Sequence, residues 1–267
     1  EKNTIFTNVA ITEDNDVWWE GIDGEVPDNL TDWELKPWKK TDDRPAAHPN
    51  CRFTVRADQS PSIAKEWEDP NGVEISAVLV GGRRKDTIPL VHESTSWAHG
   101  IFMGSIMGSE ITAAAISDSI GKVRRDPFAM LPFIGYHVGD YLNHWFDVAK
   151  NRDESKLPRF YYVNWFQKDD EGNFIWPGFG DNSRVLKWIF ERVDNKVSAK
   201  ETFIGNIPGE NDLDLTNIDV NYEQLFKLDK NLWQEEVKSI EAFYETIGEK
   251  LPQELKDQLT KLKNEIL

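Results

Sequence analysis

Residues 164–183 read Asn-Trp-Phe-Gln-Lys-Asp-Asp-Glu-Gly-Asn-Phe-Ile-Trp-Pro-Gly-Phe-Gly-Asp-Asn-Ser. Five large aromatic rings lie within 15 residues of this stretch, and most of them flank the polar turn at 168–173. The apolar run at 160–163 comes just before and predicts a buried strand. Ser183 comes at the end and predicts the N-cap of a helix. A strand that leads through a turn into a helix is typical of α/β and α+β proteins.

The aromatic stretch has two interpretations. Flat apolar walls beside an amide suit a purine base, because each stacked base contributes about 1–3 kcal/mol and an amide distinguishes guanine from adenine by its donors and acceptors. Glycines on both sides of Phe179 favour this interpretation, because glycine lets the backbone approach a ligand closely. The alternative is a β-hairpin whose rings pair across the strands as part of the core.

The rest of the chain predicts strands mixed with helices. We expect short strands at 3–9, 73–80, 88–91 and 101–102, a helix at 138–148, and two C-terminal helices, the second opened by Pro252. This pattern predicts an α/β class with a mixed sheet, flanking helices and two terminal helices. A turn cluster at 68–72 predicts a boundary between segments 1–70 and 71–267.

Composition excludes some classes of partner. The net charge of −16 over 267 residues argues against nucleic acid and anionic membranes, since both are polyanions. No apolar run is long enough to span a bilayer. The single cysteine, Cys51, excludes an internal disulfide and is compatible with a cytoplasmic location. The chain begins at Glu1 without a methionine, so we expect a piece of a longer protein.

Two stretches that contain arginine are candidate anion sites. Gly-Gly-Arg-Arg at 81–84 follows a predicted strand, where α/β sheets bind ligands, and arginine suits phosphate and carboxylate. Simple surface charge is the alternative for these two adjacent arginines. Asn50 and Arg52 alternate, so on an extended backbone they point the same way and could hold a dicarboxylate or a phosphate. The alternative there is a loop with one solvated arginine.

Other motifs are weak or missing. Residues 104–121 are rich in Gly, Ser and Ala, which predicts either a closing lid or an ordinary helix and loop. The five histidines show no metal-binding spacing. The sequence has no Gly-x-x-x-x-Gly-Lys-Ser/Thr phosphate loop and no Gly-x-Gly-x-x-Gly fingerprint. These patterns alone do not predict a complete catalytic centre.

The pieces in this order resemble one family closely, the GTP-dependent phosphoenolpyruvate carboxykinases, and in particular their bacterial branch. The matching runs are Asn-Thr-Ile-Phe-Thr-Asn-Val at 3–9, His-Pro-Asn-Cys-Arg-Phe at 48–53, Gly-Gly-Arg-Arg at 81–84, His-Gly-Ile-Phe at 99–102, Met-Gly-Ser-Glu at 107–110, Thr-Ala-Ala-Ala at 112–115, Arg-Arg-Asp-Pro-Phe-Ala-Met at 124–130, Asn-Trp-Phe at 164–166 and Trp-Pro-Gly-Phe-Gly-Asp-Asn-Ser-Arg-Val at 176–185. The likeness covers essentially the whole chain.

The resemblance implies roles for matching residues. The parent reaction converts oxaloacetate and GTP into phosphoenolpyruvate, GDP and CO2. By resemblance, Arg52 and Arg83 are catalytic and meet the transferred phosphate. The resemblance further implies three groups: substrate contacts from Asn50, Cys51 and Arg52; GTP contacts from Arg52, Arg83, Trp165, Phe166, Phe174, Phe179, Gly180, Asp181 and Asn182; and a mobile lid at about 111–121 with Glu110, Thr112, Ala113, Ala114 and Ala115.

The departures from the family also matter. In the family, the phosphate loop, its reactive cysteine and the ligands of manganese (or magnesium) lie upstream of the matched region, so we expect no metal ligands in this chain. We therefore expect the chain alone to be inactive and to need the N-terminal part of the same enzyme as its partner. Two alternatives stay open: a non-catalytic guanine-nucleotide or protein-interaction module, and aromatic rings that serve only as core.

Overall fold

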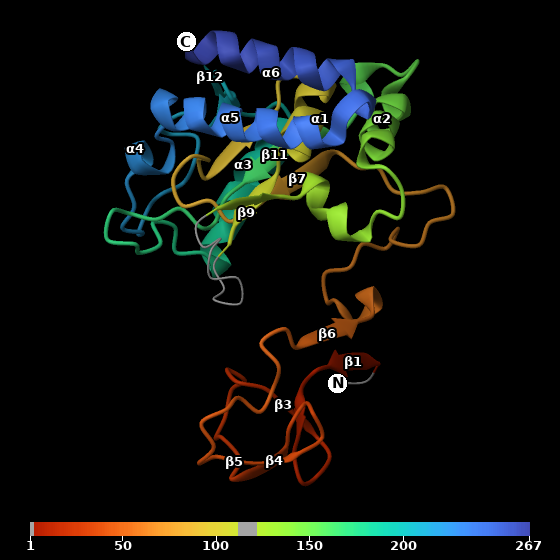
Figure 1. Ribbon diagram of the computed structural model, residues 1–267, viewed down its shortest axis with the longest axis vertical. Coiled ribbons are helices and arrows are strands. Elements are labelled where there is room, and N and C mark those ends of the chain that lie inside the picture. Colours follow the sequence, from red (N-terminus) through yellow and green to blue (C-terminus); the bar gives the residue numbers. More distant parts are fainter. Residues whose placement is uncertain (1–2, 112–121) are drawn as a thin grey trace. The chain divides into compact units, whose positions relative to one another are not determined.

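The computed structural model describes residues 3–111 and 122–267 (Figure 1). The chain divides into two compact units, Glu1–Glu74 and Ile75–Leu267. The sequence predicts a boundary after residue 70, and the structure has it after Glu74.

The second unit is built on a five-stranded sheet with the strand order β12-β13-β8-β11-β7. The central strand β11 pairs in parallel with β7 and antiparallel with β8, so the sheet is mixed. A separate antiparallel pair, β9 and β10, lies beside it. The strands are β7 (Ala77–Gly81), β8 (Val91–Glu93), β9 (Gly108–Glu110), β10 (Val123–Arg125), β11 (Arg159–Val163), β12 (Lys200–Thr202) and β13 (Gly205–Ile207).

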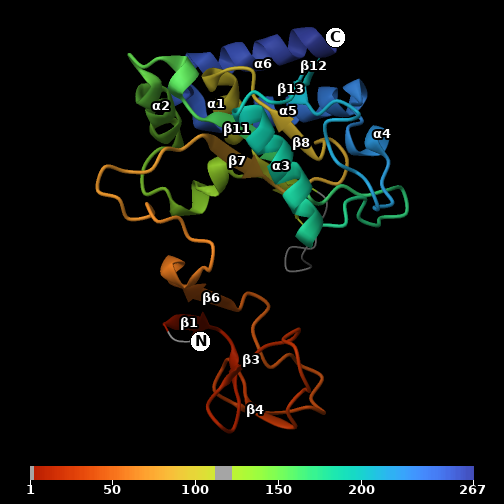
Figure 2. The same cartoon turned by 180° about the vertical axis from the view of Figure 1, so that it is seen from behind.

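Helices cover both faces of this sheet. Figure 1 shows α1, α5 and α6 on one face, and Figure 2 shows α3 crossing the other. The mixed α/β class and the two terminal helices are as the sequence predicts. No helix in residues 3–111 or 122–267 has the length and apolar character of a membrane span. The helices are α1 (Trp97–Ser105), α2 (Val138–Ala149), α3 (Asn182–Val193), α4 (Tyr222–Leu225), α5 (Lys230–Ile247) and α6 (Gln253–Ile266).

Strand β11 joins the two hydrophobic cores of this unit. Phe160 and Tyr162 belong to the core under α1, α5 and α6, whereas Tyr161 belongs to the core under α3. Side chains alternate across a strand, so a continuous apolar run fits burial on both faces. At Gly100 in α1, a Cβ atom would lie 2.1 Å from the Phe160 ring. Only glycine therefore lets α1 pack this closely against β11.

Two local predictions are wrong. Residues 101–102 lie in helix α1 and not in a strand, because Ser96 caps that helix by accepting a hydrogen bond from the His99 N–H (3.1 Å). Short apolar runs do not distinguish strand from helix. Ser183 is not an N-cap: α3 begins at Asn182, and the Ser183 hydroxyl donates to the Gly180 carbonyl (2.6 Å). The strands predicted at 73–80 and 88–91 are shifted to β7 and β8.

The first unit is a small β structure. Its core is small and consists of Ala10, Trp18, Leu30, Trp38 and Ala46. The strands are β1 (Thr4–Thr7) paired with β6 (Arg52–Val55), and a sheet in the order β3-β2-β4-β5 with β2 (Ala10–Ile11), β3 (Val17–Trp18), β4 (Asn29–Thr31) and β5 (Pro37–Lys39).

Candidate functional site

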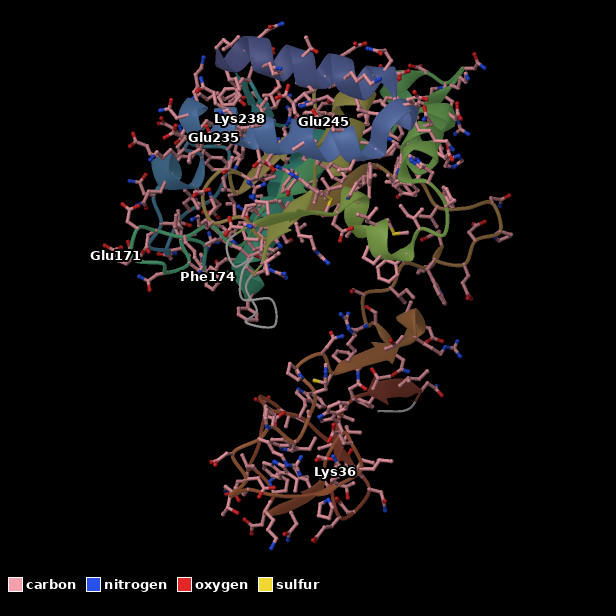
Figure 3. All side chains as sticks on the ribbon, in the orientation of Figure 1. Lys36, Glu171, Phe174, Glu235, Lys238 and Glu245 are labelled. Carbon is pink, nitrogen blue, oxygen red and sulfur yellow. The ribbon has the colours of Figure 1, made fainter. Side chains whose placement is uncertain are left out.

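The polar turn at 168–173 closes a β-hairpin at the periphery of the second unit. Lys168 and Phe174 form an antiparallel bridge. The Asp169 N–H donates to the Asn173 carbonyl (3.0 Å), and the Asn173 N–H donates to the Asp169 carboxylate (2.8 Å). Figure 3 shows the labelled Glu171 and Phe174 at the edge of the unit. The hairpin is present, so what decides between the two interpretations is where its rings lie.

The aromatic rings of the stretch divide between core and surface. Trp176 is 2% exposed and packs in the core under α3, with Trp165 half-buried against the same core. Phe166, Phe174 and Phe179 are 37%, 58% and 95% exposed. The Phe166 and Phe174 rings meet edge to face, with centroids 6.0 Å apart. Three rings are therefore available to a flat ligand, while Trp165 and Trp176 pack in the core under α3.

The backbone around Phe179 has an uncommon conformation. Gly178 has φ +76°, a region where glycine is at ease, and Phe179 itself has φ +48°. A bulky residue at positive φ is strained, and such strain clusters at ligand-binding sites. A short 3-10 turn, Phe179–Asp181, then leads into α3. The result is a fully exposed ring held beside the first turn of a helix.

Asn182 lies at the start of α3 with a fixed orientation. Its Oδ1 accepts a hydrogen bond from the indole Nε1–H of Trp176 (2.8 Å). An indole nitrogen can only donate, so the contacting atom of Asn182 must be the oxygen. The Nδ2 group then has no partner in the described part of the chain and is left as a donor. Such a donor matches the carbonyl oxygen of guanine and opposes the amino group of adenine.

Gly180 and Asp181 shape the entry into the helix. The Asp181 carboxylate accepts a hydrogen bond from Arg184 Nε (2.8 Å). Arg184 also donates to the backbone carbonyl of Asp214 (2.9 Å). The acidic side chain is thus balanced by a cation, and the Gly180 carbonyl is occupied by Ser183.

The Gly-Gly-Arg-Arg loop follows β7 and presents Arg83 to solvent. A Cβ atom at Gly82 would lie 2.2 Å from the Gly108 carbonyl oxygen, so the loop packs directly on β9. The Arg83 N–H donates to Ser109 Oγ (3.1 Å), and its carbonyl accepts from the Glu110 N–H (2.9 Å). Its guanidinium has no partner among residues 3–111 and 122–267, which leaves it free to bind an anion.

Arg84, one residue later, is buried in an ion-pair cluster. It donates two hydrogen bonds to the Glu236 carboxylate (2.8 and 2.6 Å), and Arg125 donates a third (2.9 Å). Burial alone raises the pKa of Glu236, but the two arginines outweigh it and lower that pKa below its ordinary value. The sequence did not predict this cluster, because Arg84 and Glu236 are far apart in the chain.

Asn164 connects the arginine loop to the aromatic stretch. Its Nδ2 donates to the carbonyls of Arg84 and Ile88 (2.8 Å each), and its Oδ1 accepts from the Phe166 N–H (3.2 Å). The side chain is 0% exposed, so these hydrogen bonds satisfy backbone groups that water cannot reach. A polar residue directly after a buried strand is the sequence signal for such a role.

In the first unit, Asn50 and Arg52 are in contact. Arg52 Nε donates to Asn50 Oδ1 (3.0 Å), which agrees with their alternation along the backbone. The Asn50 N–H donates to Nδ1 of His48 (2.9 Å). Both side chains are exposed, and Cys51 between them is a half-buried free thiol. The Arg52 Nη atoms have no partner in the described ranges.

Two expectations concern the metal and the lid. Among the described residues, no group of three or more His, Cys, Asp or Glu side chains could hold a metal ion. The expected lid residues 112–115 lie outside the described residues. Glu110 is described: it ends β9, and its carboxylate accepts from the Lys85 N–H (3.0 Å).

Comparison with known proteins identifies what the chain is similar to. Residues 1–265 match the family model described as the phosphoenolpyruvate carboxykinase C-terminal P-loop domain. A phosphoenolpyruvate carboxykinase (GTP) from Renibacterium salmoninarum is 51% identical over 267 residues, covering 99% of this chain and 44% of that protein. The protein of the same name from Treponema pallidum is 50% identical over 276 residues, covering 100% of this chain and 45% of that protein. The chain therefore spans less than half the length of these relatives.

Proposed function

Because the chain belongs to the GTP-dependent phosphoenolpyruvate carboxykinase family, we propose that it supplies the guanine-nucleotide site of an enzyme that converts oxaloacetate and GTP into phosphoenolpyruvate, GDP and CO2. In this proposal, segment 1–70 contacts oxaloacetate or phosphoenolpyruvate, and segment 71–267 binds the nucleotide. The partner of this chain is the remainder of the same enzyme, and the enzyme is located in the cytoplasm.

The observation that carries the proposal is the combination of exposed rings with one oriented amide. A guanine base between Phe166 and Phe179 gains stacking energy of about 1–3 kcal/mol per ring. Asn182 Nδ2 then donates to the guanine carbonyl oxygen, because its own oxygen is held by Trp176. An adenine in the same place puts its amino group against another donor. This arrangement supports a preference for guanine.

The arginines are suited to the phosphoryl step. Decarboxylation of oxaloacetate leaves an enolate, and positive groups stabilise its oxygen. Transfer of the γ-phosphoryl group to that oxygen depends mainly on positioning and charge neutralisation. We assign this role to Arg52 and Arg83, with Asn50 orienting Arg52 and with Cys51 as a small residue beside the substrate. The Arg83 guanidinium and the two Nη atoms of Arg52, which have no partner within residues 3–111 and 122–267, support this assignment.

Two parts of the proposal concern groups beyond the described residues. Closure of residues 111–121 over the site would exclude water, which otherwise protonates the enolate to pyruvate. Manganese or magnesium would add positive charge at the enolate oxygen and the phosphates. The described residues offer no cluster that fits such an ion, so the steps above rest on the arginines alone.

Calorimetry on the 267-residue chain tests the base specificity. We expect GDP to bind more tightly than ADP, and Phe179→Ala to weaken GDP binding by about 1–3 kcal/mol while changing the free energy of unfolding by less than about 0.5 kcal/mol. Phe190 on α3 is also an exposed phenylalanine, so Phe190→Ala is the matched control and should leave GDP affinity unchanged. Equal affinities for GDP and ADP would contradict the proposal, and loss of stability without a nucleotide effect would make Phe179 part of the core.

A turnover assay separates the enzyme from a simple nucleotide-binding module. We expect the chain alone, with GTP, manganese and oxaloacetate, to form no phosphoenolpyruvate, because the sequence lacks a phosphate-loop motif. The full-length enzyme should form product, and Arg83→Gln in it should abolish turnover. Product formation by the isolated chain would show that the expected inactivity is wrong. Unchanged turnover in Arg83→Gln would leave only a non-catalytic binding role for this region.

A further inference from the structure

The backbone of the Gly-Gly-Arg-Arg loop is bonded to one edge of β9 by three hydrogen bonds around Arg83. The Arg83 N–H donates to Ser109 Oγ (3.1 Å), and the Arg83 carbonyl accepts from the Glu110 N–H (2.9 Å). The N–H of Lys85 donates to Glu110 Oε1 (3.0 Å). Two of these three bonds use side chains of β9 as acceptors. Ser109 and Glu110 together therefore fix the main chain on both sides of the Arg83 side chain.

The strand that carries these two acceptors is itself held from its other side. β9 pairs antiparallel with β10 along its whole length. Arg125, the last residue of β10, donates to the buried carboxylate of Glu236 (2.9 Å). Arg84 in the loop donates to the same carboxylate (2.8 Å). The loop and the β9–β10 pair are thus tied to one point on α5, and β9 is a firm support for the backbone of the loop.

The hydrogen bonds to Ser109 and Glu110 are placed to orient the loop more than to stabilise the fold. Arg83 and Lys85, whose N–H groups make these bonds, are exposed, so water can replace a lost acceptor at little cost in stability. A water molecule does not fix the direction of the backbone as a side chain of β9 does. Arginine is long, so a small turn of its backbone moves its guanidinium by a large distance.

We propose that Ser109 and Glu110 are positioning residues that direct the Arg83 guanidinium at the transferred phosphate. This inference rests on the proposed role of Arg83. Glu110 is suited to act through the backbone and not by contact with the phosphate, because a carboxylate repels an anion. A misplacement of about 1 Å in a charged group that acts on the reacting atoms can lower a rate by about a hundredfold. The expected signature is a loss of rate without a loss of stability.

Kinetics of the full-length enzyme test the hydrogen bond to Ser109. We expect Ser109→Ala to lower kcat by about tenfold to a hundredfold while the Kd for GDP stays unchanged. Ser109→Thr keeps the hydroxyl and suits a strand, so it should restore most of kcat. Ser198→Ala, at an exposed position in the same unit, is the matched control and should leave kcat unchanged. Thermal midpoints of all three variants should lie within about 3 °C of the unchanged enzyme.

Two variants of Glu110 separate its hydrogen bond from its charge. Glu110→Gln removes the charge but keeps an oxygen that can accept from the Lys85 N–H, so it should retain most of kcat. Glu110→Ala removes both and should lower kcat by about tenfold or more. Equal losses in the two variants would show that charge is what matters, which overturns the positioning role of Glu110.

A double-mutant cycle on nucleotide binding shows whether Ser109 acts through Arg83. Arg83→Gln should weaken GTP more than GDP, because only GTP carries the transferred phosphate. Ser109→Ala should also weaken GTP relative to GDP in the unchanged enzyme, and it should have no further effect when Arg83 is already glutamine. Equal effects of Ser109→Ala in both backgrounds overturn the inference. So does full turnover in Ser109→Ala and Glu110→Ala when Arg83→Gln is inactive. Full turnover in Arg83→Gln contradicts the proposed function instead.

Discussion

Arg83 and Arg84 are adjacent in the chain, yet they belong to two parts of the second unit with opposite properties. The Arg83 guanidinium is exposed and unpaired among the described residues, whereas Arg84 is buried and makes two hydrogen bonds to Glu236. The aromatic stretch divides in the same way, with Phe179 at 95% exposure and Trp176 at 2%. We call these parts the exposed face, comprising Arg83, Phe166, Phe174, Phe179 and Asn182, and the buried layer, comprising Arg84, Arg125, Asn164, Trp176 and Glu236.

Exposed binding groups and buried stabilising groups therefore alternate along the same short segments. Two of the exposed groups are held by a buried neighbour: Asn164 accepts a hydrogen bond from the Phe166 N–H, and the Trp176 indole donates to Asn182. The buried layer should therefore govern stability, and the exposed face should govern ligand affinity.

The largest expected effect is from Glu236→Gln. It leaves Arg84 and Arg125 buried without a counter-charge, which costs about 3–5 kcal/mol of unfolding free energy. Glu235, the preceding residue, is the matched control, because it is exposed and pairs with Lys238 on the outside of α5 (Figure 3). Glu235→Gln should cost less than about 0.5 kcal/mol. Urea unfolding of the two variants measures both values, and equal losses would show that the buried cluster contributes no more than a surface pair.

Asn164→Leu is expected to have the next largest effect. The substitution keeps the size of the side chain but leaves the carbonyls of Arg84 and Ile88 and the Phe166 N–H unpaired, at about 2–4 kcal/mol in total. Asn173→Leu in the exposed hairpin turn is the control and should cost under about 1 kcal/mol. Thermal unfolding compares them. A small loss of unfolding free energy in Asn164→Leu would mean that water replaces these hydrogen bonds. Asn164 would then not be what holds the Gly-Gly-Arg-Arg loop against the aromatic stretch.

The sequence predicts the exposed face of the second unit and the Asn50–Arg52 pair of the first unit better than it predicts the buried layer. Glycines around Phe179 and the alternation of Asn50 and Arg52 are local signals, and the structure has an exposed ring and a contacting pair at those places. The Glu236 cluster and the burial of His92 depend on packing between elements far apart in the chain, which no local pattern reports. Strand boundaries also moved, because an apolar run such as 101–102 fits a helix as well as a strand.

The pH dependence of stability tests the buried histidines. His92 and His99 titrate at about 3 and 4 in the folded chain but near 6.5 when unfolded. Below pH 6.5 the unfolded state therefore binds the extra protons, and stability falls with falling pH by up to about 1.4 kcal/mol per pH unit for each ring. His92→Phe should remove one such contribution and so flatten the slope between pH 6 and pH 4 relative to the unchanged chain. Identical slopes in the variant and in the unchanged chain would mean that His92 is not desolvated.

The smallest expected effect concerns the exposed face. Lys168 Nζ lies 5.0 Å from the centroid of the Phe174 ring, an exposed cation–π contact worth about 0.5–1 kcal/mol. Lys168→Met keeps the aliphatic stem and removes the charge, so unfolding free energy should fall by no more than this amount. Lys187→Met on α3 is the control for losing one exposed charge. If Lys168→Met lowered the free energy of unfolding as much as Glu236→Gln does, the hairpin would belong with the buried layer. Only a side chain that supports the core can lower stability so much when its exposed ammonium group is removed.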